Sequence, residues 1–391
     1  MSKQQHLAAA LSEVGKLPLS WANVFAEVDR AAFVPAKVWF DDEHGHPQPI
    51  GRDTDPVRWQ AAVYSNEPVV TQLDHGRTVW PDTSLLVTSS TSQPSMMLIM
   101  LDALDVHEGH TVLEIGTGTG YNTALLCQRL GDDHVTTIEV DPALATWARE
   151  ALSDAGYRPW VVCGDGATGW PPGAPYDRVI ATAAVMAGRL PYAWIEQTRP
   201  GGQILTPWGT AYDNGVLVRL TVHGDGTASG PVVGEAAFMR LRSHDIPLGH
   251  AARLGDIIDT STSAATTTTT VPPDEVAMGD GAFSVGLHLP DVRSGVFYDD
   301  GPEHYEVLLY HVPSDSVASV KITPETTATG RYSVRQHGPR RLWDEAETAH
   351  TWWTDHGRPA QTRYGLTISR TQQQVWLDQP STMVTSAVPA A

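Results

Sequence analysis

The segment 111–121 restricts the possible folds of this chain more than any other. It predicts a short apolar strand over 111–115, a glycine-rich turn over 116–120, and a helix over 121–130. Because glycine has no Cβ, such a turn lets a ligand approach the backbone and meet the free N–H groups of a helix N-terminus. The predicted strand 135–139 then ends in a carboxylate. A glycine turn followed by an acid about twenty residues later is typical of nucleotide binding, where the acid accepts hydrogen bonds from ribose hydroxyls.

The spacing of the glycines indicates which of the known nucleotide-binding motifs this segment resembles. Gly116, Gly118 and Gly120 alternate, and Tyr121 stands where the dinucleotide fingerprint needs its third glycine. No Gly-Lys-Ser/Thr follows, which argues against a P-loop. The pattern that begins at Glu114, E-x-G-x-G-x-G, resembles the first motif of the class I methyltransferases that bind S-adenosylmethionine. The alternative is a tight strand-to-helix turn in another α/β protein.

Three downstream segments support the methyltransferase interpretation. Asp165 lies in a Gly-Asp-Gly turn that ends the predicted strand 160–163. The segment 174–177 (Ala-Pro-Tyr-Asp) precedes a further predicted strand, and the segment 199–205 (Arg-Pro-Gly-Gly-Gln-Ile-Leu) joins a helix end to another. A Gly-Asp-Gly turn alone is common, so the order of the segments carries the information.

In order and spacing these segments resemble the protein L-isoaspartyl O-methyltransferase family. The segment 28–35 (Val-Asp-Arg-Ala-Ala-Phe-Val-Pro) is similar to an early segment of that family. The segment 90–94 (Ser-Thr-Ser-Gln-Pro) matches its Thr-x-Ser-Gln/Ala-Pro signature, which precedes the methyltransferase core. The resemblance spans 20–245 with an interruption near 40–62. It implies a carboxyl O-methyltransferase that uses S-adenosylmethionine and releases S-adenosylhomocysteine.

The motifs and the resemblance predict a role for each candidate residue. In the cofactor site, the methionine part lies against the glycine turn, that is Gly116, Thr117, Gly118 and Gly120. Glu114 fixes the ammonium group of the methionine part, and Glu139 binds the ribose. Asp165 and Gly166 bind the adenine. In the substrate site we expect Ser92 as the catalytic residue beside the transferred methyl group, with Thr91 and Thr182 nearby. Ser92 could also be a helix N-cap, because Gln-Pro and an apolar-periodic run follow it, and both roles can hold at once.

Charge and composition exclude several other classes. The net charge of −19 argues against a nucleic-acid backbone as partner, because phosphate binding rests on Lys and Arg. We find no secretory signal and no stretch that approaches a membrane span. Cys127 and Cys163 lie in predicted core elements and imply no disulfide framework, so we expect a cytoplasmic protein.

The segment 41–46 holds two histidines beside acids but no further spaced ligands, so we expect no metal there. We expect this segment to be a loop that caps the active site.

The chain is long enough for more than one domain. Strands alternating with amphipathic helices predict a Rossmann-like, doubly wound α/β sheet over 91–246, with antiparallel last strands from a hairpin over 215–233. A helical cap with a substrate-side loop precedes it over 1–90. The Thr-rich segment 247–274 has the composition of a linker. A smaller α+β domain follows over 275–391.

The segment 275–391 shows no recognisable chemistry. We expect strands over 282–289 and 305–311, a helix over 341–355 and a hairpin over 363–377. The segment is rich in tryptophan and arginine, which are favoured at binding hot spots. It is therefore either a small core with solvated charges or a surface that recognises a substrate peptide.

The resemblance leaves several functions open. The family implies methylation of an isoaspartyl carboxylate, which leads through a succinimide to repair of aged proteins. The run 89–95 and the segment 336–341 resemble a branch found in actinobacterial pathways that modify ribosomal peptides, the lanthipeptides, graspetides and lasso peptides. That branch methylates a normal Asp and so installs an aspartimide or isoaspartate. Because of the loop near 41–62 and the added domain, we favour this tailoring role over general repair. Methylation of a small-molecule acid and a non-catalytic binding module are further alternatives.

Overall fold

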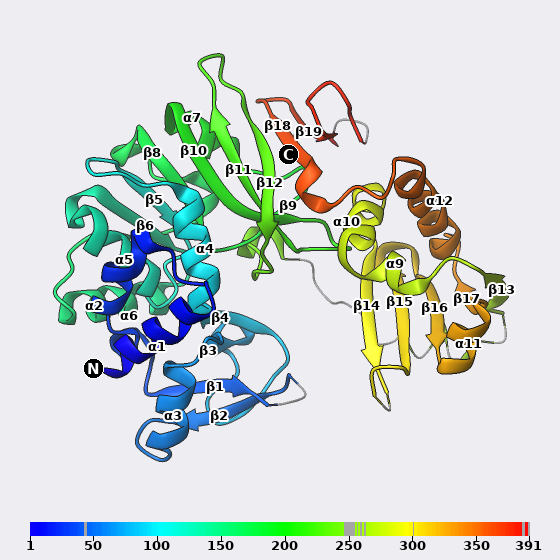
Figure 1. Cartoon of the computed structure of the whole chain (residues 1–391), viewed down its shortest axis with the longest axis horizontal. Helices are drawn as coiled ribbons and strands as arrows, with labels where there is room; N and C mark the ends of the chain where they lie inside the picture. The colour runs from blue at the N-terminus through cyan, green and yellow to red at the C-terminus, as the bar shows by residue number, and fades with distance from the viewer. Residues whose placement is uncertain are drawn as a thin grey trace.

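The computed structural model of the chain describes residues 1–42, 45–245, 255, 257–258, 260–261, 263–299, 301–384 and 388–389. Within these residues an eleven-stranded sheet runs through the molecule, with two smaller sheets beside it (Figure 1). Its order is β20-β19-β18-β12-β11-β10-β8-β5-β6-β7, and β9 pairs with β10. The strands that form the methyltransferase part of this sheet are β5 (Val112–Ile115), β6 (Val135–Glu139), β7 (Trp160–Cys163), β8 (Tyr176–Ala181), β9 (Val185–Met186), β10 (Thr198–Gly209), β11 (Val216–Val222) and β12 (Ala228–Glu235).

The main sheet is parallel in its first half and antiparallel in its second. Strand β5 pairs in parallel with β6 on one side and β8 on the other, and β8 pairs in parallel with β10. Strands β11 and β12 form an antiparallel hairpin beside β10. This arrangement confirms the predicted doubly wound sheet with antiparallel last strands. Its helices are α4 (Pro94–Leu104), α5 (Tyr121–Leu130), α6 (Pro142–Asp154) and α7 (Tyr192–Glu196).

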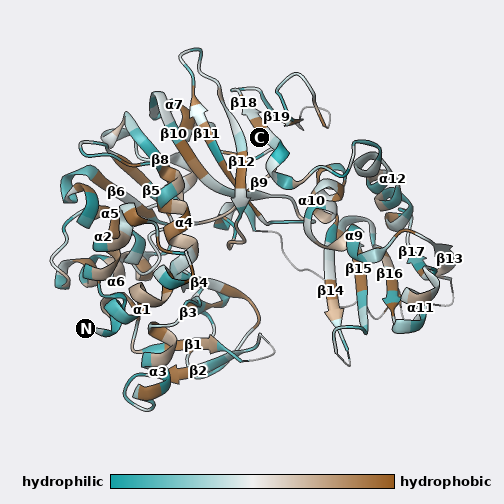
Figure 2. Cartoon of the chain, viewed as in Figure 1, coloured by the Kyte–Doolittle hydropathy of each residue, from teal (hydrophilic) through white to brown (hydrophobic). Residues whose placement is uncertain are grey.

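Two hydrophobic layers cover the faces of the main sheet. On one face helices α4, α5 and α6 pack with α1 (Lys3–Glu13) and α2 (Ala22–Glu27). On the other face α7 packs with α10 (Gly279–His288). Hydrophobic residues gather on helix α4 and on strands of the main sheet (Figure 2). The buried apolar residues of α4 and α6 therefore form part of the core, as expected of amphipathic helices that pack on a sheet.

The N-terminal part contains a sheet as well as helices. Strands β1 (Lys37–Asp41), β2 (Pro47–Gly51), β3 (Val69–Leu73) and β4 (Val87–Thr91) form a sheet of order β2-β1-β3-β4. Helix α3 (Pro56–Val63) packs on this sheet through Trp59 and Val63. The predicted helical cap with a substrate-side loop over 1–90 therefore also contains a four-stranded sheet, which the sequence did not predict. Short alternating segments such as β1 and β2 carry a weaker signal than a long helix.

A C-terminal unit, residues 265–355, has its own core. It comprises a five-stranded sheet of order β13-β17-β16-β15-β14, with helices packed against it. Its elements are β13 (Ala265–Thr269), α9 (Pro273–Ala277), α10, β14 (Arg293–Tyr298), β15 (Tyr305–His311), β16 (Ser316–Ile322), α11 (Pro324–Thr329), β17 (Tyr332–His337) and α12 (Leu342–Asp355). The unit confirms the predicted α+β character.

Two predictions for this region are wrong in detail. The segment 282–289 is helix α10 and not a strand. It is apolar all round because Phe283 joins the core of the main sheet whereas Val285 joins the core of the C-terminal unit. A short apolar run of this kind cannot be assigned by periodicity. The threonines predicted as linker form strand β13, since β-branched residues suit a pleated surface. The rest of the predicted linker, from 247 to 264, is described only in part.

The predicted tail hairpin is present, but it belongs to the main sheet. Strands β18 (Tyr364–Ile368) and β19 (Gln372–Leu377) pair antiparallel, and β18 pairs with β12. Strand β20 (Val388–Pro389) follows β19. The chain therefore leaves the main sheet after β12, builds the C-terminal unit, and returns. The predicted boundary placed all of 275–391 in one separate domain, because this long-range pairing leaves no local trace in the sequence.

Candidate active site

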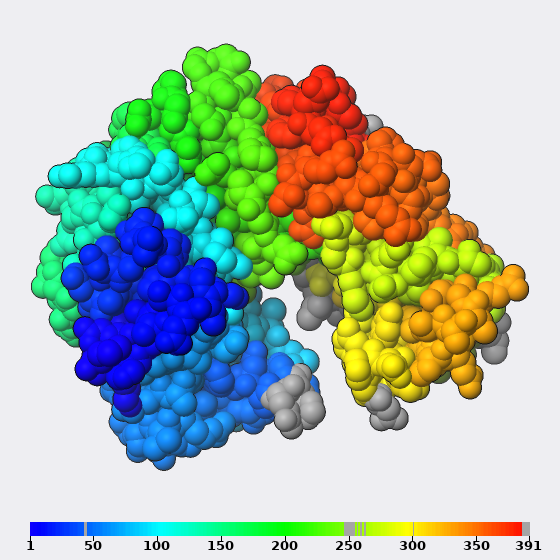
Figure 3. Space-filling model, viewed as in Figure 1, coloured from blue at the N-terminus to red at the C-terminus, as the bar shows by residue number. Residues whose placement is uncertain are grey.

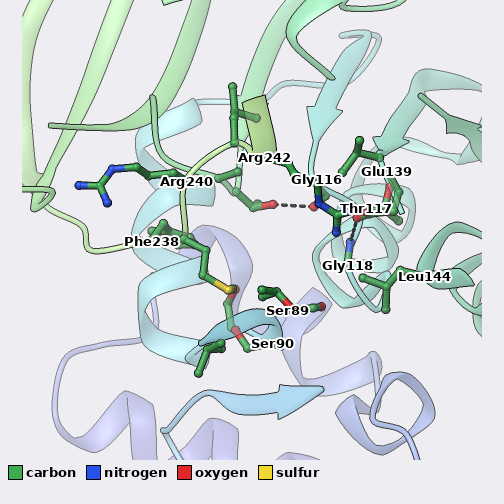
Figure 4. A pocket seen from close by; sticks show the side chains of 18 of the residues that line it. Ser89, Ser90, Gly116, Thr117, Gly118, Glu139, Leu144, Phe238, Arg240 and Arg242 are labelled. Atoms are coloured by element: carbon green, nitrogen blue, oxygen red, sulfur yellow. Dashed lines mark hydrogen bonds between the residues drawn. The ribbon is translucent and has the colours of Figure 1, made fainter. Parts of the chain in front are cut away.

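A cavity of about 730 Å³ lies at the carboxyl ends of β5, β6 and β8. Strand β5 is the switch point of the sheet, because β6 and β7 lie on one side of it whereas β8 and β10 lie on the other. Open α/β sheets bind their ligands at this position. The glycine turn, strand β4 and the segment 238–245 face one another across the cavity (Figure 4).

Residues 116–119 of the glycine turn form one wall of the cavity. The amide of Gly116 donates to Ile138 O at 2.8 Å, and Thr182 Oγ1 donates to Gly116 O at 2.6 Å. Gly118 has φ of +53°, and a Cβ placed on it would come no closer than 3.8 Å to Ser90 O. That space belongs to the cavity, so the bare backbone is open to a ligand. Gly116, Thr117, Gly118 and Thr182 all line the wall.

Glu139 reaches the cavity from the end of β6. Its Oε2 accepts a hydrogen bond from the amide of Gly118 at 2.9 Å, and its Oε1 accepts one from Asp141 N at 3.0 Å. Burial raises the pKa of Glu139, and these two backbone donors oppose the rise. The acid thus fixes the glycine turn at the same time as it faces the cavity (Figure 4).

Glu114 and Gly120 do not belong to the described cavity wall. Glu114 is fully buried, and its carboxylate accepts hydrogen bonds from Asn122, Thr123 and Thr137. Burial raises its pKa. Glu114 therefore does not face the cavity, where we predicted it to contact the cofactor. It joins β5 to the first turn of α5 instead. Gly120 precedes α5 with φ of +84° and packs against Leu152.

Asp165 and Gly166 lie where the sequence predicts them, beside the end of β7. Both line the cavity, and Asp165 is exposed. Asp165 Oδ1 accepts a hydrogen bond from Ala167 N at 2.9 Å. A Cβ on Gly166 would collide with Ile115, so the close approach of the two segments requires glycine there.

Ser92 lines the opposite side of the cavity, just after β4. Helix α4 begins at Pro94 with Gln93 as its N-cap and no side-chain cap, so the interpretation of Ser92 as a helix cap is wrong. In the described part of the chain Ser92 Oγ makes no hydrogen bond, whereas Thr91 Oγ1 is 2.9 Å from Thr119 Oγ1. The Ser92 hydroxyl is therefore available to a ligand.

The buried Arg30 holds this serine in place. Its guanidinium donates to Thr91 O at 3.1 Å and to Ser92 O at 3.0 Å, and also to Val63 O and Glu67 O. Burial lowers its pKa to about 10. The sequence marked Arg30 only as part of the segment 28–35, and gave no sign that it anchors the end of β4.

The sequence missed several residues of the cavity. The segment 238–242 (Phe-Met-Arg-Leu-Arg) crosses it, and Arg242 Nη2 lies 3.3 Å from Asp141 Oδ2. Arg293, the first residue of β14, brings the C-terminal unit to the wall. These residues have no local motif, and no periodic pattern could have marked them. None of the described residues of 41–62 lines the cavity, and residues 43–44 of the predicted capping loop lie outside the described residues.

Two further features concern metals and membranes. Among the described residues, no cluster of three or more His, Cys, Asp or Glu side chains could hold a metal ion. The described helices include none with the length and apolar character that a membrane span needs.

The fold and the cavity together define a class I S-adenosylmethionine-dependent methyltransferase. The cavity has the size of a small-molecule site, and an open glycine backbone, Glu139 and Asp165 line it. Residues 2–245 match the family described as Protein-L-isoaspartate(D-aspartate) O-methyltransferase (PCMT). The chain belongs to this family.

Individual relatives agree with the family. The chain is 39% identical over 163 residues to a protein-L-isoaspartate O-methyltransferase of Methanopyrus kandleri, covering 39% of this chain and 71% of the relative. It is 34% identical over 224 residues to one of Anaeromyxobacter dehalogenans, covering 57% of this chain and 88% of the relative.

A solved structure shares the larger architecture. A structure titled protein-L-isoaspartate O-methyltransferase aligns with a TM-score of 0.53 and 19% identity. The alignment covers 96% of this chain and 100% of that one. At this identity the likeness concerns the fold alone. The shared fold extends beyond the methyltransferase core, because the alignment includes the C-terminal unit.

Proposed function

We propose that this chain methylates the side-chain carboxylate of isoaspartyl residues in peptides or proteins. The observation that carries the proposal is the joint position of the Ser92 hydroxyl and the glycine turn on one cavity, within the part of the chain that matches the family. The relatives' names agree with this activity. The resulting role is repair of damaged proteins.

The reaction needs alignment more than it needs acid–base catalysis. S-adenosylmethionine supplies an activated methyl group: a carboxylate oxygen forms the new O–CH₃ bond while the S–CH₃ bond breaks and its electron pair stays on sulfur. An aspartyl-type carboxyl group, with an ordinary pKa of about 3.9, is already ionised at neutral pH. No general base is then required. Correct alignment can lower the barrier by about 7–11 kcal/mol.

The residues of the cavity divide between the two ligands. The backbone of Gly116 and Gly118, with Glu139 and Asp165, would hold the cofactor. Ser92 Oγ would donate a hydrogen bond to the acceptor carboxylate and orient it. Arg30 keeps Ser92 in position by holding its carbonyl group.

The methyl ester then breaks down without the enzyme. The next backbone nitrogen attacks the ester carbonyl, methanol leaves, and a succinimide forms. Water opens the succinimide to a mixture of aspartate and isoaspartate. Repeated methylation of the isoaspartate would convert it gradually to aspartate.

A second candidate is methylation of a normal Asp in one dedicated ribosomal peptide. The observation that favours it is Arg293, because through this residue the C-terminal unit reaches the cavity and could read a particular substrate. The names of the relatives refer to isoaspartate, which is the acceptor in the repair reaction. Repair is therefore the better supported function.

The deciding experiment compares two short peptides that differ only in isoaspartate against aspartate at one position. Methyl transfer from S-adenosylmethionine is followed by mass spectrometry. Turnover of the isoaspartyl peptide alone supports repair, whereas turnover of the aspartyl peptide supports the tailoring role. Turnover of neither peptide by an enzyme that binds the cofactor contradicts general repair. Free dicarboxylic acids, assayed in parallel, test a small-molecule acceptor.

A further inference from the structure

Strand β14 (Arg293–Tyr298) lies at one edge of the five-stranded sheet of the C-terminal unit. In the described part of the chain it pairs with β15 only, in an antiparallel register that continues over its whole length without a bulge. Proteins commonly protect an open sheet edge with a bulge, a proline or several charges. The segment 293–298 contains no proline and has one charged residue, at its first position. We call the unpaired side of this strand the β14 edge.

The alternation of hydrogen bonds shows which backbone groups point to the β14 edge. Asp299, directly after the strand, donates its N–H to His304 O at 2.9 Å, in the register that joins β14 to β15. Successive residues of a strand direct their N–H and C=O groups to opposite sides. Counting back from Asp299, the residues whose groups point to the β14 edge are Ser294, Val296 and Tyr298. A polypeptide in extended conformation offers donors and acceptors that match this spacing.

The β14 edge begins at the cavity and leads away from it. Arg293, the first residue of the strand, lines the cavity. At about 3.3 Å per residue, Tyr298 lies about 17 Å further along the strand. Figure 1 shows β14 on the side of the C-terminal unit that faces the N-terminal part, and Figure 3 shows the molecule hollowed between them. A peptide whose acceptor lies in the cavity can therefore continue along the β14 edge.

Two exposed aromatic side chains lie at the far end of the β14 edge. Phe297 is 54% exposed and Tyr298 is 58% exposed. Because the two residues are consecutive, their side chains lie on opposite faces of the sheet. An added strand would therefore find an aromatic neighbour on each face, which is a favourable cross-strand contact. The opposite edge of this sheet, β13, exposes threonines instead.

We propose that the β14 edge binds an extended segment of the substrate polypeptide as an added strand, while the acceptor residue lies at Ser92. This inference rests on the proposed peptide methylation and assigns a binding role to the C-terminal unit. Binding by strand addition draws its affinity from main-chain hydrogen bonds, so it tolerates many sequences. Such tolerance suits an enzyme that acts on isoaspartate in different proteins.

The first test varies the length of the peptide around one identical isoaspartyl acceptor. A short peptide is compared with peptides extended by about twelve residues, or about 40 Å, on the N-terminal or the C-terminal side. With the full-length enzyme, one of the two extensions should lower KM about tenfold at similar kcat, because several main-chain hydrogen bonds are added. Scrambling the sequence of that extension should leave KM unchanged. Equal KM values for the short and both extended peptides would overturn the inference.

The second test asks whether the main chain of the extension makes the contact. Two versions of the effective extension carry N-methyl groups on alternate amides, one at the odd and the other at the even positions. One version should lose the tenfold gain, because its donors toward the β14 edge are removed, and the other should keep most of it. Equal KM values for the two versions would contradict strand addition.

A pair of variants locates the effect at the β14 edge. Val296→Pro removes an N–H that points to the edge but leaves the pairing with β15, a position where edge strands accept proline. It should abolish the gain from the extension. Val296→Ala is the matched control, since it also loses the valine side chain but keeps the N–H, and it should retain the gain. The thermal midpoints show whether both variants fold. A gain that survives in folded Val296→Pro would assign the contact to another surface.

A second copy of the chain is the competing occupant of the β14 edge. Analytical ultracentrifugation of the full-length protein distinguishes the two occupants. A monomer leaves the edge open to the substrate, as the inference requires. A dimer that Val296→Pro dissociates would overturn the inference, because the partner copy would then cover the edge.

A binding measurement separates this inference from the proposed function. If no peptide is methylated, the proposed activity fails. Fluorescence anisotropy of the labelled peptides with the enzyme and S-adenosylhomocysteine then still tests the β14 edge. Tighter binding of the extended peptide that Val296→Pro abolishes and Val296→Ala retains supports the inference, and equal binding of the short and extended peptides contradicts it.

Discussion

Glu139 offers the sharpest test of the cofactor site. Replacing it by Ala removes the carboxylate that faces the cavity and also the acceptor of the Gly118 and Asp141 amides, at 2.9 and 3.0 Å. Hydrogen bonds to a charged group contribute about 1.5–3 kcal/mol each. Loss of one such bond to the ribose corresponds to a cofactor Kd that is about 10- to 100-fold weaker. Disorder of the glycine turn would add to the loss.

The Glu139→Gln variant removes the charge of this side chain but keeps its shape. Its amide oxygen can accept from one of the two backbone donors, but its NH₂ group would then face the other donor. We therefore expect Glu139→Gln to weaken cofactor binding as well, though less than Glu139→Ala. Isothermal titration with S-adenosylmethionine and S-adenosylhomocysteine measures both variants. The thermal midpoint of each shows whether the fold is intact.

The control and the refuting result are simple. Glu150→Gln changes an exposed glutamate of helix α6 that does not line the cavity, and it should leave the Kd unchanged. A folded Glu139→Ala enzyme whose Kd stays within about twofold of the unchanged protein would refute the proposed ribose contact, because no hydrogen bond of the expected strength is then lost.

Four further predictions address the substrate site and the fold. Ser92→Ala should keep the cofactor Kd but lower kcat, as measured by methyl transfer, because the orienting hydroxyl is lost. Gly120→Ala should lower the free energy of unfolding in urea by about 1–3 kcal/mol, because φ is +84° and its Cβ would lie 3.2 Å from Leu152 Cγ. Burial raises the pKa of Asp213 to about 6 from 3.8. The folded state thus holds this proton more tightly, and stability falls as pH rises through that interval, so Asp213→Asn should raise the thermal midpoint at pH 8 but not at pH 4. Truncation of 364–391 should destabilise the methyltransferase part by more than about 5 kcal/mol, because the buried apolar residues of β18 and β19 leave its core.

Each of these predictions has a contrary outcome. Unchanged turnover in Ser92→Ala would leave the serine without a function at the acceptor. A Gly120→Ala protein of unchanged stability would show that the turn tolerates a side chain. An equal midpoint shift at both pH values would mean that Asp213 does not titrate as described. A truncated chain that keeps its thermal midpoint would show that β18 and β19 are dispensable for the main sheet.

The local elements of the core were predictable because their signals lie in consecutive residues. The turn at Gly116 and Gly118, the helix α5 and the acid at the end of β6 follow from spacing alone, and the structure contains all three. Helix α10 was not predictable. It lies between two cores, so its apolar residues show no preferred face.

The candidate site likewise contains residues whose role the sequence predicts and residues whose position only the fold decides. Glu139 ends a predicted strand, and Ser92 could be named from the resemblance of the segment 90–94 to the family signature. Glu114 belongs to the same motif, yet the structure turns it inward to Asn122 and Thr123. A motif fixes the order of residues along the chain, but the direction of a side chain depends on what packs around it.

By itself, the sequence determined the class of fold, the cofactor and the glycine wall of its site, because a strand, a tight turn and an acid at the next strand end are encoded within about thirty residues. Only the tertiary structure decided that β18 completes the main sheet, that Arg30 anchors the end of β4, and that Arg293 reaches the cavity. These contacts join residues far apart in the chain. They arise when separate segments bury their surfaces together, and no local pattern records them.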